Sequence, residues 1–141
     1  MGLNLTIRLS SKQKKFVESA RIARFATISA SGMPHVVPMC FAFDNGNVVI
    51  PIQCETHKMH NLVENDRVSL AIDEYSEDWS KLRGVVMQGK AEITKGGEVF
   101  LGLRDLIYRK YPQFEKLFPI EEGKYWMIKV RLTRFASWGL K

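Results

Sequence analysis

The sequence predicts a mainly β fold with a few helices, in which antiparallel strands close into a small barrel. Two observations lead to this prediction. Runs of β-branched and aromatic residues recur along the chain and are joined by short turn sequences, as in consecutive hairpins. Only one polar, helix-like segment, residues 56–66, interrupts these runs, and five or six antiparallel strands usually close into a barrel that removes their free edges.

Length and composition agree with one compact domain. The 141 residues fit a single domain spanning 1–141, and 45% hydrophobic against 26% charged residues supports a packed core. No apolar run reaches the roughly 20 residues that span a bilayer, and no apolar segment precedes a cleavage site, so we expect a cytoplasmic protein that does not enter membranes. Cys40 and Cys54 lie in apolar runs and are expected to be reduced core residues.

The N-terminal part predicts a helix followed by hairpins. Residues 10–23 have an amphipathic pattern, with Ser10 or Ser11 as the N-cap. Its apolar side is formed by Phe16, Val17 and Ala20. Residues 23–32 then predict a strand that ends in the turn Ser31-Gly32.

Residues 33–54 predict two further strands joined by a turn across residues 44–47, which read Asp-Asn-Gly-Asn. Pro38 and Pro51 cannot donate to a central ladder, so they indicate bulges, edges or places where a ligand meets the backbone.

The C-terminal part alternates strands and helical pieces. Residues 67–75, 84–94 and 125–138 predict strands, and residues 77–83 predict a short turn or helical piece. Residues 98–111 predict a helix whose inward face is formed by Val99, Leu103, Leu106 and Ile107.

The polar segment 56–66 offers three interpretations: an anion site, a metal site or a solvated helical turn. If Thr56 caps a helix, Lys58 and Asn61 lie on one face and His57, His60 and Glu64 on the adjacent one. The histidine spacing matches no established zinc motif, so we predict no metal. A helix N-terminus with a hydroxyl and a lysine suits an anion.

A net charge of +6 also suits an acidic ligand or a nucleic acid. The basic clusters at residues 12–15 and 21–24 lack an RNA-binding aromatic signature or a zinc finger. A basic nucleic-acid-binding barrel is therefore the least favoured alternative.

Three segments follow one another in the chain: FATISASGMPHVVPMCFAFD, with the pattern A-T…G-x-P, then THKMHNLVENDRVSLAI, and then GVVMQGKAEI, with the pattern V-x-x-x-G-x-A. In this order they resemble the opening, the phosphate-binding turn and the following strand of the pyridoxamine 5′-phosphate oxidase-like, FMN-binding split-barrel superfamily. The segments DEYSEDWSKLR and FASWG look closest to the branch of coenzyme F-420 (deazaflavin)-dependent enzymes.

The resemblance implies a split β-barrel, FMN or coenzyme F-420 as the cofactor, and a homodimer that binds it between subunits. It places the cofactor phosphate at Thr56, His57 and Lys58, with Asn61 as an addition from the same turn. It places the flavin ring along Val36, Val37, Pro38, Met39, Pro51 and Ile52. Trp138 is either a core aromatic or a ring over the cofactor edge.

The resemblance implies a flavin- or deazaflavin-dependent oxidoreductase that transfers a hydride to or from a small organic substrate. The main alternative is a non-catalytic flavin-binding or cofactor-storage protein. Val36 and Phe41 stand where the oxidase itself has an Arg and a Lys, His57-Lys58 stands for its Arg-Lys pair, and Gly84 stands for its glutamine. These departures argue against pyridoxamine phosphate as the substrate.

Overall fold

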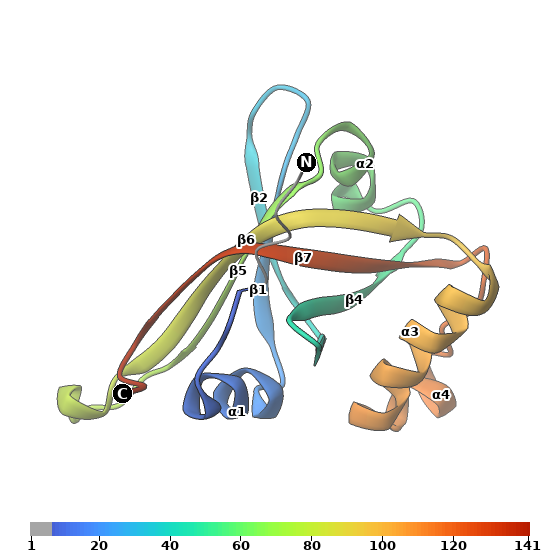
Figure 1. The fold of residues 1–141 in the computed structure, drawn as a ribbon. Helices are drawn as coiled ribbons and strands as arrows, with labels where there is room; N and C mark the ends of the chain where they lie inside the picture. The colour runs from blue at the N-terminus through green and yellow to red at the C-terminus, as the bar shows by residue number, and fades with distance from the viewer. Residues whose placement is uncertain (1–6) are drawn as a thin grey trace, which may run out of the picture.

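The structure, a computed structural model, describes residues 7–141. Seven strands form one antiparallel sheet in the order β2-β1-β5-β6-β7-β4-β3, and this sheet curls into a half-barrel (Figure 1). The predicted split-barrel fold is confirmed. The elements are, in chain order, α1 (Ser11–Ser19), β1 (Ala23–Ile28), β2 (Pro34–Met39), β3 (Ala42–Asp44), β4 (Asn47–Gln53), α2 (His57–Glu64), β5 (Arg67–Glu74), the 3₁₀ turn η1 (Trp79–Lys81), β6 (Arg83–Thr94), α3 (Gly97–Lys110), α4 (Gln113–Leu117) and β7 (Tyr125–Trp138).

The two long strands β6 and β7 form the centre of the sheet and cross the whole molecule (Figure 1). Their register shifts at Gln88 and Gly89, where a side chain at Gly89 would overlap the carbonyl of Arg131. Such a bulge bends a strand and increases its twist, which helps the sheet to curl. One face of this curl encloses the main core, in which Phe25, Phe41, Ile50 and other apolar side chains are fully buried.

The helix α3 covers a second apolar cluster on β4 and β7. Phe100 and Ile107 are its buried residues, and Leu103 and Leu106 pack beside them. The expected inward position of Val99 is wrong, because this side chain is 63% exposed and Phe100 takes its place. Phe100, Leu103 and Ile107 lie at spacings of three and four residues, which is one helical face.

The N-terminal helix is confirmed, but it ends at Ser19 and not at the expected residue 23. Ser10 is the N-cap of α1 and forms a capping box with Gln13, which satisfies two backbone N–H groups reciprocally. Phe16 and Val17 are buried in the main core, and Ala20 is partly buried against it.

Residues 33–54 form three strands where two were expected. The predicted turn is present, since Asn45 and Gly46 both have positive φ and join β3 to β4. The first of the two expected strands is broken after Met39, because β2 pairs with β1 while β3 pairs with β4. The short helix α4 was not expected either. Among residues 7–141, no helix is long and apolar enough to cross a membrane.

Candidate functional site

The helix α2 begins where the polar segment starts, at the end of β4. Thr56 is its N-cap, as predicted, but its hydroxyl donates to the carbonyl of Gln53 over 2.8 Å and forms no cap hydrogen bond. The first bond within the helix runs from the His60 N–H to the Thr56 carbonyl. The N–H groups at the start of α2 therefore have no side-chain cap and can receive an anion.

A pocket of about 330 Å³ lies beside this helix start. Four residues predicted to bind the cofactor line it together: Pro38 and Met39 from β2, Pro51 from β4, and Lys58 from α2. Lys58 is the only charged side chain among the lining residues, and burial lowers the pKa of its ammonium group below the ordinary value. An apolar pocket with one cation at its rim suits a flat apolar ring that carries an anionic tail.

The pocket also has walls that the sequence did not predict. They are Ile22, Cys40, Gln53, Phe114 and Tyr125, the last two from α4 and from the start of β7. Gln53 donates its amide N–H to the Tyr125 hydroxyl over 3.2 Å, so a hydrogen-bonded pair borders one side. Cys40 and Gln53 neighbour predicted residues in the chain, whereas Phe114 and Tyr125 are distant in sequence and are brought to the pocket only by the tertiary structure.

Cys40 faces two basic groups as well as this pocket. Burial raises the pKa of its thiol, while the charges of Arg21 and Lys110 act in the opposite direction. Lys110 itself has a pKa of about 8, lowered by burial and then by Arg21, and its ammonium group lies 3.9 Å from the centre of the Phe41 ring. Because burial outweighs the cations, Cys40 is a protonated thiol and no activated nucleophile.

His57, the first residue of α2, stacks on His35 of β2 with ring centroids 4.8 Å apart. His57 is exposed, and Nδ1 of His35 is buried with no hydrogen-bond partner among the described residues. Within residues 7–141, no group of three His, Cys, Asp or Glu side chains is arranged to hold a metal ion.

Three other predicted cofactor residues, Val36, Val37 and Ile52, do not line the pocket. Val36 is 63% exposed on β2, and Val37 lies half-buried opposite Phe25. Ile52 is fully buried in the main core and does not line the pocket. Phe41, which stands where the oxidase has a Lys, is also fully buried.

Asn61 was predicted to join the phosphate site, but its side chain turns into the protein. It is 5% exposed and donates its amide N–H to the Thr27 hydroxyl of β1 over 3.0 Å. This bond satisfies a buried polar pair between α2 and the sheet.

Trp138 lies at the other end of β7, directly opposite Gly84. A side chain at Gly84 would overlap its indole ring, so the glycine makes room for the ring. Tyr125 of the pocket is the first residue of β7 and Trp138 the last. Within one chain, Trp138 is therefore remote from Lys58.

Comparison with known proteins agrees with this geometry. Residues 9–139 match the model of the family described as pyridoxamine 5′-phosphate oxidase. The chain belongs to the pyridoxamine 5′-phosphate oxidase family. One curated relative is the 5a,11a-dehydrotetracycline/5a,11a-dehydrooxytetracycline reductase of Streptomyces rimosus, which is 30% identical over 93 residues. The match covers 62% of this chain and spans 66% of that reductase.

Solved structures show that this member of the pyridoxamine 5′-phosphate oxidase family shares its fold with proteins of differing ligands. A conserved hypothetical protein of Mycobacterium tuberculosis has a TM-score of 0.79 at 24% identity, over 98% of this chain and 89% of that one. An FAD-binding protein of Mesorhizobium loti has a TM-score of 0.74 at 20% sequence identity, over 92% of each chain. A heme storage protein of Vibrio cholerae has a TM-score of 0.76 at 15% sequence identity, over 94% of each chain.

Proposed function

We propose that this protein is a flavin-type oxidoreductase that transfers a hydride between FMN, or the deazaflavin coenzyme F-420, and a small organic substrate. The observation that carries the proposal is the pocket beside α2, where Pro38, Met39 and Pro51 form apolar walls next to the Lys58 ammonium group. The curated relative is a reductase, and one structural relative binds FAD. Both agree with a redox cofactor of this kind.

The residues present fit such a cofactor in two parts. The uncapped start of α2, with the partial positive charge of a helix N-terminus, and Lys58 would hold a phosphate. Pro38, Met39 and Pro51 would border the ring system and exclude water from one of its faces. The cofactor supplies the hydride chemistry when bound. The protein has to position the ring and the substrate.

We also propose a homodimer with the cofactor at the subunit interface. At about 330 Å³, the pocket is at the small end of the range for ligand sites, and a second subunit would deepen it. Trp138, remote from the pocket in its own chain, is the residue that the partner would bring to the ring.

Free, half-buried Cys40 and Cys54 suit a reducing compartment, so we place the protein in the cytoplasm.

A second candidate function is the binding or storage of a cofactor without catalysis. The heme storage protein with the same fold supports it, as does the exposed His57, which stacks on the His35 ring. An imidazole nitrogen open to solvent would be available as a ligand to a heme iron.

Titration by calorimetry with FMN, coenzyme F-420 and heme separates these functions. We expect FMN or F-420 to bind one per subunit, and the loaded protein to be reduced by a nicotinamide or a reduced deazaflavin. Tight binding without any reduction would support storage. Heme binding that removes flavin binding, with a Soret band lost in His57→Ala, would support the second candidate and contradict the first.

A further inference from the structure

Three basic side chains lie in one register across β5, β6 and β7. Arg67 is directly opposite Lys90, and Lys90 is directly opposite Arg131. All three residues are exposed. Because neighbouring strands are about 4.8 Å apart, the three positions span roughly 10 Å. We refer to Arg67, Lys90 and Arg131 as the cation row.

No acidic side chain neutralises the cation row within residues 7–141. The five ion pairs of the described chain all involve other basic residues. Glu92, two residues beyond Lys90 on β6, lies opposite another cation, Lys129. Like charges directly opposite each other in a sheet are destabilising. A bound anion would remove this repulsion.

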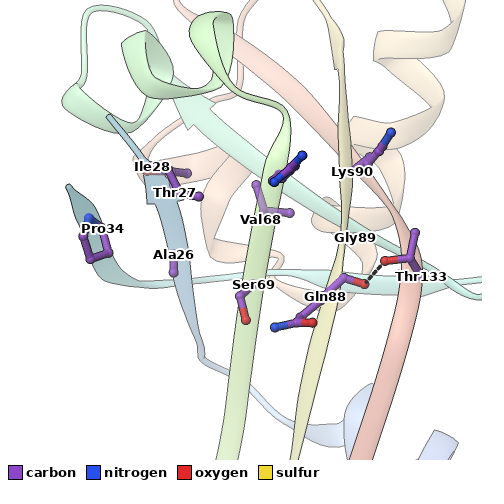
Figure 2. A pocket seen from close by; sticks show the side chains of 11 residues that line it. Ala26, Thr27, Ile28, Pro34, Val68, Ser69, Gln88, Gly89, Lys90 and Thr133 are labelled. Carbon is purple, nitrogen blue, oxygen red and sulfur yellow. Dashed lines mark hydrogen bonds between the residues drawn. The ribbon is translucent and has the colours of Figure 1, made fainter. Parts of the chain in front are cut away.

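A cavity of about 470 Å³ lies beside the cation row, and Arg67 and Lys90 are among its lining residues. Figure 2 shows this cavity, with Lys90 labelled. Its other walls combine apolar and hydrogen-bonding groups from the five strands β1, β2, β5, β6 and β7: Ala26, Thr27, Ile28, Pro34, Val68, Ser69, Gln88, Gly89 and Thr133. Ser69 and Gln88 are directly opposite each other. The Thr133 hydroxyl donates to the Gln88 carbonyl, which leaves the side-chain amide of Gln88 for a ligand.

We propose that the cation row and this cavity form a second binding site, for a small phosphate ester. Adjacent phosphate groups would lie on Arg67, Lys90 and Arg131, because guanidinium groups bind phosphate oxygens through paired N–H donors. The organic part would lie in the cavity against Ile28 and Pro34, within reach of the Gln88 amide. Nucleoside di- and triphosphates have this chemistry.

The second site is independent of the proposed function. It shares no lining residue with the pocket beside Lys58, which lies between β2, β4, α2 and α4. The phosphate ester can therefore bind even if FMN and F-420 do not. Equally, FMN or F-420 can bind even if the phosphate ester does not.

Calorimetry with ATP, inorganic tripolyphosphate and adenosine tests the site at low ionic strength, where surface charges are least screened. We expect one ATP per chain, weaker binding of tripolyphosphate and the weakest binding of adenosine. The double variant Arg67→Gln/Arg131→Gln should bind ATP at least about tenfold more weakly, since two charged contacts are removed. A matched control, Lys15→Gln/Lys116→Gln, removes two exposed charges elsewhere and should bind ATP as the wild type does.

Thermal unfolding shows whether a loss of ATP binding in the double variant comes from lost contacts or from an unfolded chain. Without ligand, Arg67→Gln/Arg131→Gln should melt at or above the wild-type temperature, because repulsion is relieved. ATP should raise the melting temperature of the wild type and of the control, and leave that of the double variant unchanged.

Several results would overturn the second site. One is equal ATP affinity in the wild type and in Arg67→Gln/Arg131→Gln, and another is no ATP binding by the wild type at about 1 mM. Tighter binding of a single-stranded oligonucleotide than of ATP, with several chains per strand, would identify an extended nucleic-acid surface. A change in oligomeric state alone, seen by light scattering in the double variant, would identify a contact between copies of the chain.

Discussion

The imidazole rings of His35 and His57 stack with their centroids 4.8 Å apart and their planes 16° apart. This contact ties the first residue of α2 to β2 across the edge of the sheet. It therefore fixes the direction in which the start of α2 faces the pocket beside Lys58.

We expect His35→Ala to lower the free energy of unfolding by about 1 kcal/mol, the usual contribution of a stacked aromatic pair. His35→Phe keeps a ring in place and should recover most of this loss. Urea denaturation measures both, with His60→Ala as the control on the exposed side of α2. Equal stability of His35→Ala and His60→Ala would show that the stack contributes nothing.

Lys58→Ala should weaken the binding of FMN or F-420 by about 1.5–3 kcal/mol, or roughly ten- to a hundredfold, because a charge-assisted bond to phosphate is lost. Thr56→Val should cost less, since the Thr56 hydroxyl is already bonded to Gln53. Lys116→Ala on α4 is the matched control and should bind normally. Unchanged affinity of Lys58→Ala for both cofactors would contradict the phosphate assignment.

The pH dependence of cofactor binding gives an independent test of Lys58. Burial lowers the pKa of its ammonium group, so the free protein loses this charge at a lower pH than an ordinary lysine does. The charged form binds the phosphate, and affinity should therefore fall as the pH rises through that lowered pKa. The fall should be absent in Lys58→Ala, as seen by titration across the alkaline range.

The sequence predicted the start of α2 and four walls of its pocket because these residues are close to one another along the chain. Residues 38, 39, 51 and 58 follow one another closely in the chain, in β2, in β4 and at the start of α2. Phe114 and Tyr125 could not be predicted in the same way. Phe114 reaches the pocket through the packing of α4 against α3 and of α3 against the sheet, and Tyr125 through the pairing of β7 with β4.

The two residues whose predicted positions differ from the structure, Val99 and Asn61, also have physical explanations. A helical period marks a face but leaves its rotation open by one residue, so Val99 was placed inward although Phe100 is the larger apolar side chain at the neighbouring position. Asn61 lies on the predicted helix, yet its direction was decided by Thr27, a buried hydroxyl on β1 that required a partner.

Asn61→Ala should lower the free energy of unfolding by about 1–3 kcal/mol, because it leaves the buried Thr27 hydroxyl unsatisfied. Cofactor affinity should stay within a few fold of the wild type if Asn61 is purely structural. The double variant Asn61→Ala/Thr27→Val should recover part of the stability, since both polar partners are then absent. A loss of cofactor affinity as large as that of Lys58→Ala, in folded Asn61→Ala, would instead assign Asn61 to the phosphate.

Lys110 makes stability depend on pH in a defined direction. Its pKa is about 8 in the folded protein, below the ordinary value of 10.5. Between these values the unfolded chain binds more protons, so the free energy of unfolding should rise as the pH increases from about 8 toward 10.5.

Lys110→Met should remove this rise and stabilise the protein at pH 7 by about 1 kcal/mol, after allowance for solvent screening and for the lost contact with Phe41. Lys116→Met, with an exposed side chain, serves as the control. Urea denaturation at neutral and alkaline pH measures both effects. A destabilised Lys110→Met would mean that the cation–π contact outweighs the cost of burying the ammonium group.

Trp138 provides the test of the proposed dimer, because its indole lies over Gly84 at the opposite end of β7 from the pocket residue Tyr125. If the partner subunit brings this ring to the cofactor, Trp138→Leu should weaken cofactor binding by about 1 kcal/mol, or several fold, and raise the fluorescence of bound flavin. Gly84→Ala should have the same effects by displacing the ring. Trp79→Leu, at an exposed position, is the control. Light scattering should show a dimer in every variant, whereas a monomer that retains its cofactor, or unchanged affinity and fluorescence in Trp138→Leu, would refute the arrangement.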